Sequence, residues 1–401
     1  MRSLLGTDSV FRDRLRGVVQ ELASYQRELA LSGEQEEEIR RRIQSFGHVS
    51  RPRRDFLVGG VDGSGDFPCV QFADSFVYVT TAASVAYRTD PIDGLCEVDI
   101  GLESVGEPVW LPAQQGLKDE RLDEAFERIV GRSIEDTISA SDYRTLKHEL
   151  TGEGADPREL REGLIRPPGH DAANLGVQLR STAELAGALK LIEAESKPDY
   201  VLVDTTLSLP LVTRKRASLF FEHVKRLCCV VARRRGVAFV AISKSHGMPR
   251  IDLIEDLARD VAGLRRPQEA EHWYLRLWQG FPMTEGRRVP PVGAVSYLVR
   301  FHRQVPVLRV DLDEEFWEER IRSDDEEETR DRERSLFEDL DYCCHDQRCY
   351  GYPYPIKAGH DRCSLTQDER TMIRKLVKDA AAEAGVPREL FEEPSIETGH
   401  E

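Results

Sequence analysis

Apolar side chains recur at three- and four-residue spacing near the N-terminus, where Leu15, Val18 and Leu22 follow a polar residue suited to an N-cap, Asp8. This spacing places the apolar residues on one face of a helix. It predicts an amphipathic helix over residues 8–31. We expect this helix to pack within the chain or against a second copy rather than on DNA.

The pattern changes to that of strands after residue 55. An apolar run ends at Asp62 in a glycine-rich turn, and residues 76–87 then carry the β-branched and aromatic side chains of a second strand. Two successive strands predict an antiparallel start. From Ser181 onward, helix and strand patterns alternate, as expected for parallel strands joined by crossovers. The chain is therefore predicted to form an α/β fold with a mixed sheet flanked by helices.

Further elements complete the expected organisation. Residues 107–175 are predicted to be an insertion with helices near 119–130 and 139–150. A helix is expected over 215–235, a hairpin from 294–301 and 305–312, a charged loop or exposed helix end at 323–334, and a last helix over 366–384 with Ser364 as its cap and Gly385 as its stop. The expected domains are an N-terminal helical extension, residues 1–50, and one α/β domain, residues 51–395.

Composition excludes several classes of protein. The chain has 401 residues and a formal net charge of −16, so it is not expected to coat nucleic acid, and any DNA contact must be local. No apolar run approaches the ~18 residues of a membrane helix, and charge interrupts the N-terminus too early for a secretory signal. We expect a cytoplasmic protein without membrane contact. Eight cysteines, which include two adjacent pairs, indicate free thiols.

Two basic stretches are candidates for a local DNA contact. The arginines at positions 40–42, 51, 53 and 54 suit either a solvated helix face and linker or a contact with phosphates near a site entrance. Residues 214–216 and 233–235 are also basic. In a homodimer they are candidates for a positively charged inner channel.

Two aspartates end apolar strands. Asp62 follows LVGGV and Asp204 follows YVLV, at the strand ends where a parallel sheet opens its ligand crevice. Either residue alone suits a turn or a helix cap. Together on neighbouring strands, the two carboxylates form a hard-oxygen site suited to Mg²⁺ or Mn²⁺.

Three other stretches carry candidate polar groups. Glu184 suits a third carboxylate, but Ser181 to Glu184 also matches a capping box, in which the glutamate bonds back to the N-cap. Lys244 follows a strand and suits either charge stabilisation of a phosphate or an exposed strand end. The proline- and glycine-rich residues 351–361 are expected to form an irregular loop carrying Tyr352 and His360, either as functional groups or as structural ones.

A cysteine-rich stretch lies next to this loop. Cys343, Cys344, Cys349 and Cys363, with His345, raise the possibility of a structural zinc or iron–sulfur site. Their spacing does not reproduce two C-x₂-C pairs. A bound metal in this segment therefore stays an alternative.

The order of these motifs resembles the NurA nuclease family. VDGSG, YVLVD-TTL, AISKS, LRVDL and GYPYPIKAGHD follow one another over roughly residues 55–365, and the first and last are the most specific. The resemblance implies an RNase H-like fold for residues 51–395. It also implies manganese-dependent 5′–3′ exonuclease and single-strand endonuclease activity, and a partnership with a HerA-type hexameric ATPase in DNA-end resection.

The same resemblance implies roles for individual residues. Asp62, Glu184 and Asp204 would bind the metal, and Tyr352 and His360 would complete the site, with His360 as a further ligand. Glu193 and Glu195 are alternatives to Glu184 for the family's glutamate. The family commonly has DGS-like residues after the second aspartate, whereas Thr205 and Thr206 follow Asp204 here, which changes the expected loop geometry.

The resulting hypothesis is a two-metal DNA nuclease that uses Mn²⁺ or Mg²⁺, forms a homodimer and repairs DNA ends. Its catalytic residues would be Asp62, Glu184, Asp204, Lys244, Tyr352 and His360. The alternative is a noncatalytic scaffold or ATPase-loading subunit with a cysteine-bound structural metal in the C-terminal segment.

Overall fold

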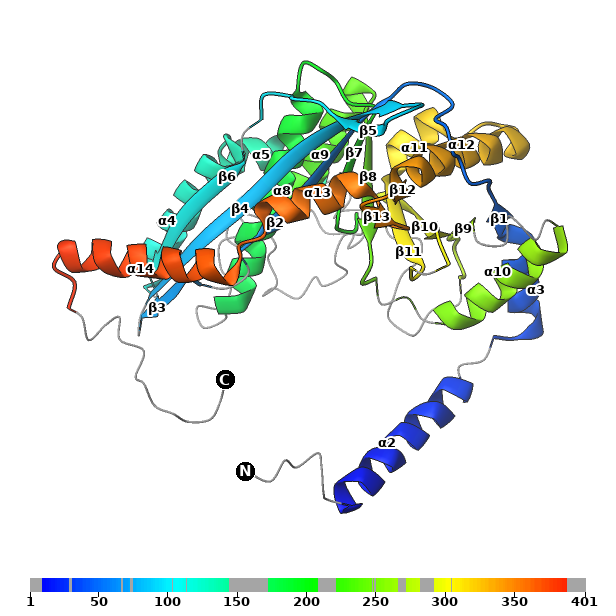
Figure 1. Ribbon diagram of the computed structural model, residues 1–401, viewed down its shortest axis with the longest axis horizontal. Coiled ribbons are helices and arrows are strands. Elements are labelled where there is room, and N and C mark those ends of the chain that lie inside the picture. Colours follow the sequence, from blue (N-terminus) through cyan, green and yellow to red (C-terminus); the bar gives the residue numbers. More distant parts are fainter. Residues whose placement is uncertain are drawn as a thin grey trace.

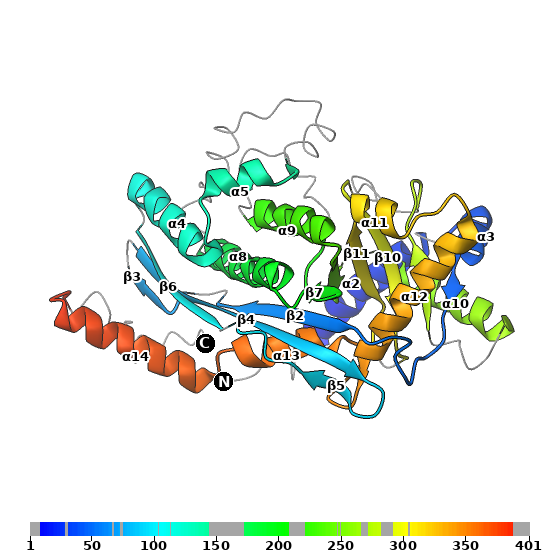
Figure 2. The ribbon, with the colours of Figure 1, turned by 90° about the horizontal axis from the view of Figure 1, so that it is seen from above.

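A computed structural model describes residues 9–28, 31–65, 68–72, 75–102, 104–112, 114–143, 172–207, 221–246, 248, 250–265, 272–281, 292–303 and 305–387 of the chain. Its centre is a mixed sheet with helices on both faces (Figures 1 and 2). Within the described residues, the sheet has 11 strands, and its main path runs β1-β9-β10-β11-β8-β7-β2-β4-β3, with β5 and β6 paired to β4. The prediction of a mixed α/β sheet flanked by helices is confirmed.

The first half of the chain supplies the edge strand β1 and, at the other end of the sheet, the strands β2 to β6. Its elements are α2 (Ser9–Glu28), α3 (Gly33–Arg42), β1 (Gln44–Ser45), β2 (Leu57–Ser64), β3 (Val70–Phe72), β4 (Ser75–Asp90), β5 (Gly94–Glu97), β6 (Val105–Pro112), α4 (Gln115–Val130), α5 (Ile134–Ala140) and α8 (Ala172–Glu193). As predicted, β2 and β4 pair antiparallel. The expected start of the insertion was wrong, because residues 107–112 belong to β6, which pairs with β4.

The second half adds the strands of this sheet that lie between β1 and β2. Its elements are β7 (Tyr200–Val203), α9 (Phe221–Arg235), β8 (Ala238–Ser243), α10 (Ile251–Arg265), β9 (Trp273–Arg276), β10 (Ala294–Arg300), β11 (Leu308–Asp313), α11 (Glu314–Arg320), α12 (Glu326–Cys344), β12 (His345–Asp346), β13 (Cys349–Tyr350), α13 (Tyr354–Cys363) and α14 (Gln367–Glu383). β7 is parallel to both β2 and β8, and β10 and β11 form the predicted hairpin.

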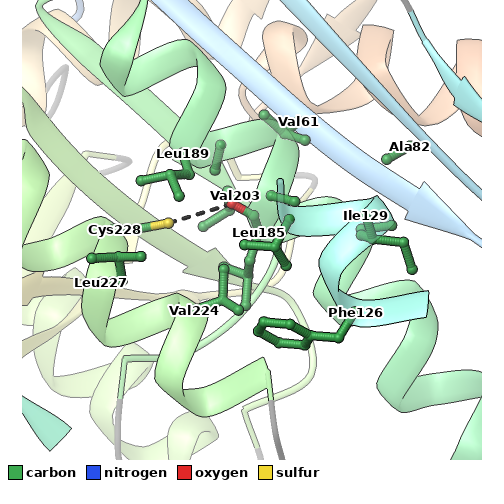
Figure 3. Close-up of a cluster of buried hydrophobic side chains, with 14 of the residues drawn as sticks. Val61, Ala82, Phe126, Ile129, Leu185, Leu189, Val203, Val224, Leu227 and Cys228 are labelled. Carbon is green, nitrogen blue, oxygen red and sulfur yellow. Dashed lines mark hydrogen bonds between the residues drawn. The ribbon is translucent and has the colours of Figure 1, made fainter. Parts of the chain in front are cut away.

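Alternating side chains of the parallel strands fill two cores. In β7, Val201 and Val203 join the cluster under α8 and α9, while Tyr200 and Leu202 join the cluster under α12 and α13. This division follows from the two-residue repeat of a strand, whose neighbouring side chains point to opposite faces. Figure 3 shows part of the first cluster, where the Cys228 thiol donates to the backbone oxygen of Leu185 at 3.4 Å. Buried on both faces, β7 holds a fixed position between the two helical layers.

Three local predictions concern the charged stretch and the two ends of the last helix. Most of the charged stretch at 323–334 forms the first half of α12, which begins after the N-cap Asp325, so the expected exposed helix end is confirmed and the loop alternative is wrong. The last helix is capped by Thr366 rather than Ser364, in a capping box with Glu369. Gly385 follows it with a φ of +78°, the left-handed conformation common after a helix end.

Some sequence predictions extend beyond the described residues. Part of the second insertion helix, at 144–150, lies outside them, as do the basic residues 214–216. α2 extends away from the sheet in Figure 1, and the exposed side chains on it include most of the predicted apolar stripe. Among the described residues, each helix is too short or too polar to cross a bilayer.

Candidate functional site

Asp62 and Asp204 come together at adjacent strand ends. Val61 in β2 pairs with Val203 in β7, and each aspartate is the next residue along its parallel strand. The Asp62 side chain is 13% exposed and its Oδ1 accepts a hydrogen bond from the backbone N–H of Gly63 at 2.8 Å. Asp204 is 29% exposed. The sheet therefore presents two carboxylates at one edge, as the strand pattern predicts.

Glu184 projects toward these aspartates from α8. Because α8 begins at Ala172, Glu184 is in the middle of the helix, and the capping-box interpretation was wrong. The helix packs so closely on β2 that a Cβ on Gly63 would lie 3.2 Å from the Cβ of Glu184. Close packing of backbone on backbone thus places this glutamate beside the strand end.

The Glu184 carboxyl group is buried without full compensation. The residue is 4% exposed, and its Oε1 is buried with no hydrogen-bond partner. Burial raises the pKa of Glu184 well above its usual range, the charge of Asp62 raises it further, and the charge of Arg180 opposes this. The charge of Asp204 also raises the pKa of Glu184, so both strand-end carboxylates disfavour the ionised form of Glu184. Buried carboxyl groups of this kind are found where a cation or a proton is held.

Lys244 and Tyr352 lie beside Asp204. The Lys244 Nζ, directly after β8, is 3.3 Å from Asp204 Oδ2 and 4.1 Å from the centroid of the Tyr352 ring. Tyr352 is buried, and burial, followed by the charge of Asp204, raises the pKa of its hydroxyl well above the usual value. A cation resting on an aromatic face gains attraction from the ring's electrons. The ring thus holds the lysine beside the carboxylate.

His360 reaches Asp62 from the other face of the sheet. The His360 Nδ1 lies 2.7 Å from Asp62 Oδ2, and the Ser364 hydroxyl lies 3.2 Å from its Nε2. Residues 354–363 form the helix α13, so the prediction of an irregular loop was wrong. Proline is tolerated in the first turn of a helix, where its missing N–H would have no partner in the helix. Pro355 occupies that turn.

Glycines let α13 approach the strand that carries Asp62. A Cβ on Gly359 would lie 3.1 Å from the backbone nitrogen of Asp62, and one on Gly60 would lie 2.2 Å from the backbone carbon of Pro355. The first distance is tight and the second is impossible for a real side chain. The glycines that suggest a loop in the sequence therefore serve helix packing, which brings His360 to the site.

All six predicted site residues belong to one cluster, and the alternatives lie elsewhere. Glu193 is exposed and pairs with Arg132, and Glu195 is exposed beyond the end of α8. The sequence predicted Ser364 only as a helix cap, not as the partner of His360, and it assigned no site role to Arg180, one turn before Glu184. The four-residue spacing of Arg180 and Glu184 was the available signal.

Arginines that the sequence did not single out line a cavity close to Asp62, whereas most arginines of the predicted basic tracts form ion pairs within the chain. Ser64 and Gly65, which follow Asp62 closely in the chain, line a cavity of about 130 Å³ together with Arg370 and Arg374 of α14. Most arginines of the predicted basic tracts instead pair with carboxylates of this chain, namely Arg40, Arg41, Arg42, Arg53, Arg54 and Arg233. Such pairing favours the interpretation of the N-terminal tract as a solvated structural surface.

The sheet order and its strand-end carboxylates place the chain among mixed α/β proteins with an acidic site at the sheet edge. The fold is similar to that of the NurA nuclease from Sulfolobus solfataricus, at 14% identity and a TM-score of 0.50 over 94% of this chain and 98% of that one. A weaker match is a second NurA structure, at 10% identity and a TM-score of 0.38 over 94% of this chain and 98% of that one. Another is an endonuclease V from Ciona intestinalis bound to inosine-containing DNA, at 12% identity and a TM-score of 0.30 over 88% of this chain and 98% of that one. No protein-family model and no curated protein matches the sequence.

Proposed function

We propose that this chain is a divalent-metal-dependent DNA nuclease with an RNase H-like core. The observation that carries the proposal is Glu184, a buried carboxyl group with an unsatisfied oxygen that faces Asp62 and Asp204. Three carboxylates held this close repel one another unless cations or protons intervene. The similarity of the fold to a NurA nuclease supports the same conclusion.

The donor set fits Mn²⁺ or Mg²⁺. Asp62, Glu184 and Asp204 supply carboxylate oxygens, the ligands that these hard cations prefer, and His360 is within reach as a nitrogen ligand or as the group that orients Asp62. These ligand atoms are not gathered around one point as tightly as a single ion requires. A spread set suits two ions roughly 3.5–4 Å apart, which would activate water and neutralise charge on the scissile phosphate.

The chain's own residues would bind and orient the DNA phosphate. Lys244, held over the Tyr352 ring beside Asp204, places a positive charge where the leaving oxygen gains charge. His360, whose Nδ1 contacts Asp62, would use its Nε2, now in contact with the Ser364 hydroxyl, for proton transfer or phosphate contact. Arg370 and Arg374 line the cavity next to the site, which gives this acidic chain a local positive surface for the DNA backbone.

We further propose a homodimer and a HerA-type ATPase as partners. The six apolar residues of the α2 stripe, Phe11, Leu15, Val18, Val19, Leu22 and Tyr25, are between 38% and 60% exposed. A stripe of this kind is stable when another surface covers it. A second copy of this chain is the first expected occupant, and the ATPase would dock on the assembled dimer.

Cleavage assays test the proposed activity. The purified chain is incubated with linear duplex DNA, closed-circular plasmid and oligonucleotides labelled at either end, with Mn²⁺, Mg²⁺ or EDTA. We expect metal-dependent shortening of the linear substrates from the 5′ end and cuts within single strands. Absence of cleavage with either metal, alone and with the ATPase, would overturn the nuclease assignment. It would favour the scaffold alternative, although burial raises the pKa of the Cys343 and Cys344 thiols and so opposes the thiolate form that a metal needs.

A further inference from the structure

A second cluster of ligand-type side chains lies apart from the Asp62 site. His48 is in the connection between β1 and β2, His272 directly precedes β9, and Asp341 and His345 are one turn apart at the end of α12. One ligand atom from each of these four residues lies within 4.8 Å of all the others. Three chain segments thus converge on one point, and none of the four residues belongs to the proposed active site.

The separations between Asp341 and the three histidines, His48, His272 and His345, are close to those between the ligands of a tetrahedral metal site. From the carboxylate oxygens of Asp341, His48 Nδ1 lies at 3.0 Å, His345 Nδ1 at 3.1 Å and His272 Nε2 at 3.6 Å. Zn–N and Zn–O bonds of about 2.0–2.1 Å set the ligands of a tetrahedron about 3.3 Å apart. To enclose one ion, the four groups would move closer together and the His345 Nδ1 would exchange its 2.9 Å contact with the Asp341 backbone oxygen for the metal.

The Asp341 carboxylate, which contacts all three histidines, is oriented by a hydrogen bond from the backbone. Asp341 is fully buried, and its Oδ2 accepts a hydrogen bond from the backbone N–H of Val49 at 3.1 Å. A backbone donor of this kind fixes the orientation of a ligating carboxylate. Three imidazoles and one carboxylate form a donor set that suits Zn²⁺ better than Mg²⁺, which prefers oxygen ligands.

The cluster is also accessible to an ion. The His48 side chain is 45% exposed. His48 and His345 line a cavity of about 590 Å³ together with residues of the β4–β5 turn such as Asp93. A path from solvent to the ligands is one of the features expected of a genuine metal site.

We propose that His48, His272, Asp341 and His345 bind one structural Zn²⁺. The ion would join the β1–β2 connection, the start of β9 and the end of α12. α12 leads through the short β12–β13 hairpin to Tyr352, and the Gly351 N–H donates to the Cys344 oxygen at 2.6 Å. Zinc at this joint stabilises the segment that carries Tyr352 and α13.

Metal analysis of the full-length protein, with any affinity tag removed, tests the proposal. The Asp62→Asn and Asp204→Asn substitutions in one chain remove the other candidate site. We expect this protein to bind one zinc per chain and to show the visible absorption bands of tetrahedral Co²⁺ after EDTA treatment and Co²⁺ addition. Zinc should raise its melting temperature.

Single substitutions in that same background separate a metal site from a hydrogen-bonded network. His48→Gln and His345→Gln should each weaken zinc binding by at least about tenfold. His302→Gln is the matched control, because its ring lies 5.9 Å from that of His345 but outside the ligand set, and it should keep full binding. Failure of the starting protein to take up stoichiometric zinc, or uptake that both ligand substitutions leave unchanged, would overturn the proposal. Neither result depends on nuclease activity.

Discussion

Two clusters of charged side chains in this molecule differ in how their carboxyl groups are paired. In the first, Arg226 of α9 donates to Asp142 at 2.7 Å and to Asp313 at 2.6 Å, and Arg233 contacts Asp313 at 3.0 Å. Arg233 also pairs with Glu315 at 2.6 Å, so two arginines meet three carboxylates, each of which is paired with an arginine. In the second, the carboxyl groups of Asp62, Glu184 and Asp204 are opposed by Lys244, by Arg180 and Lys225, which lower the pKa of Glu184, and, only if protonated, by His360.

The difference lies in what each cluster lacks. Arg226 also donates to the backbone oxygen of Gly293 at 3.0 Å, so each arm of its guanidinium is engaged. In the second cluster, Glu184 keeps a buried oxygen without a hydrogen bond. A cluster whose charged groups all have partners stabilises a fold, whereas a buried carboxyl oxygen without a partner implies a further group that binds there. The predictions below follow from this contrast.

The largest expected effect is on cleavage after loss of a strand-end carboxylate. Asp62→Asn and Asp204→Asn should each abolish metal-dependent cleavage, because each removes a charged ligand from the shared site. Both should fold normally, since the apolar residues of β2 and β7 are unchanged. Gel assays and circular dichroism measure the two properties. Near wild-type cleavage by either variant contradicts the assignment.

Glu184→Gln should separate catalysis from stability. We expect cleavage to fall by more than about 100-fold, the upper range seen when a partner outside the ligand shell is lost. The melting temperature should stay the same or rise, because glutamine removes a buried ionisable group. Glu193→Gln, on the same helix but exposed, is the control. A fall in stability with full cleavage would assign Glu184 to a structural role.

Arg226→Met tests the first cluster, in which Arg226 pairs with Asp142 and Asp313. It leaves Asp313 and Asp142 without their main partner, so unfolding should become easier by about 3–5 kcal/mol. The fraction that stays folded should cleave DNA with normal activity per molecule. Urea denaturation measures the stability. If instead the variant is stable but inactive, the two clusters have been assigned the wrong way round.

Gly60→Ala tests how α13 is positioned. The added Cβ would meet the Pro355 backbone, so the helix must shift, at a cost of about 1–3 kcal/mol. The shift should also move His360 and weaken cleavage. Gly106→Ala is a matched strand control, since a Cβ there meets nothing within 4 Å. Equal stability of the two variants, measured by urea denaturation, would disprove the close packing of α13 on β2.

The smallest effect on chemistry is expected from removal of α2. Deleting residues 1–28 keeps Ser32, which caps α3, and removes the exposed apolar stripe. Sedimentation velocity should show loss of the dimer, while cleavage per chain stays unchanged. Leu22→Glu should act like the deletion, and Gln20→Glu, with the same charge off the stripe, should not. A truncated chain that is still dimeric places the interface elsewhere.

The sequence predicts the strand-end aspartates because their signals are local. An apolar run that stops at Asp62 or Asp204 marks both the strand and its end, and strand alternation predicts that the two are neighbours. The start of α8 could not be predicted in the same way. Ser181 to Glu184 has the letters of a capping box, but the helix continues from Ala172 through them, because packing against the sheet outweighs local capping preferences.

The remaining errors come from contacts between distant residues. Glycine and proline in residues 351–361 suggest a loop, and only the closeness of β2 shows that Gly359 is needed for helix packing. The histidine cluster combines His48, His272 and His345 with Asp341, and its ligands are separated by up to 297 positions. No short spacing motif can reveal such a site.

The most direct test of the central claim is a Mn²⁺ titration followed by electron paramagnetic resonance, which reports free Mn²⁺. The protein carries His345→Gln, so that the histidine cluster does not contribute. We predict binding of two Mn²⁺ per chain, weakened strongly by either Asp62→Asn or Glu184→Gln and unchanged by Glu193→Gln. Equal binding by all four proteins would show that the Asp62 cluster does not hold the metal and would contradict the account.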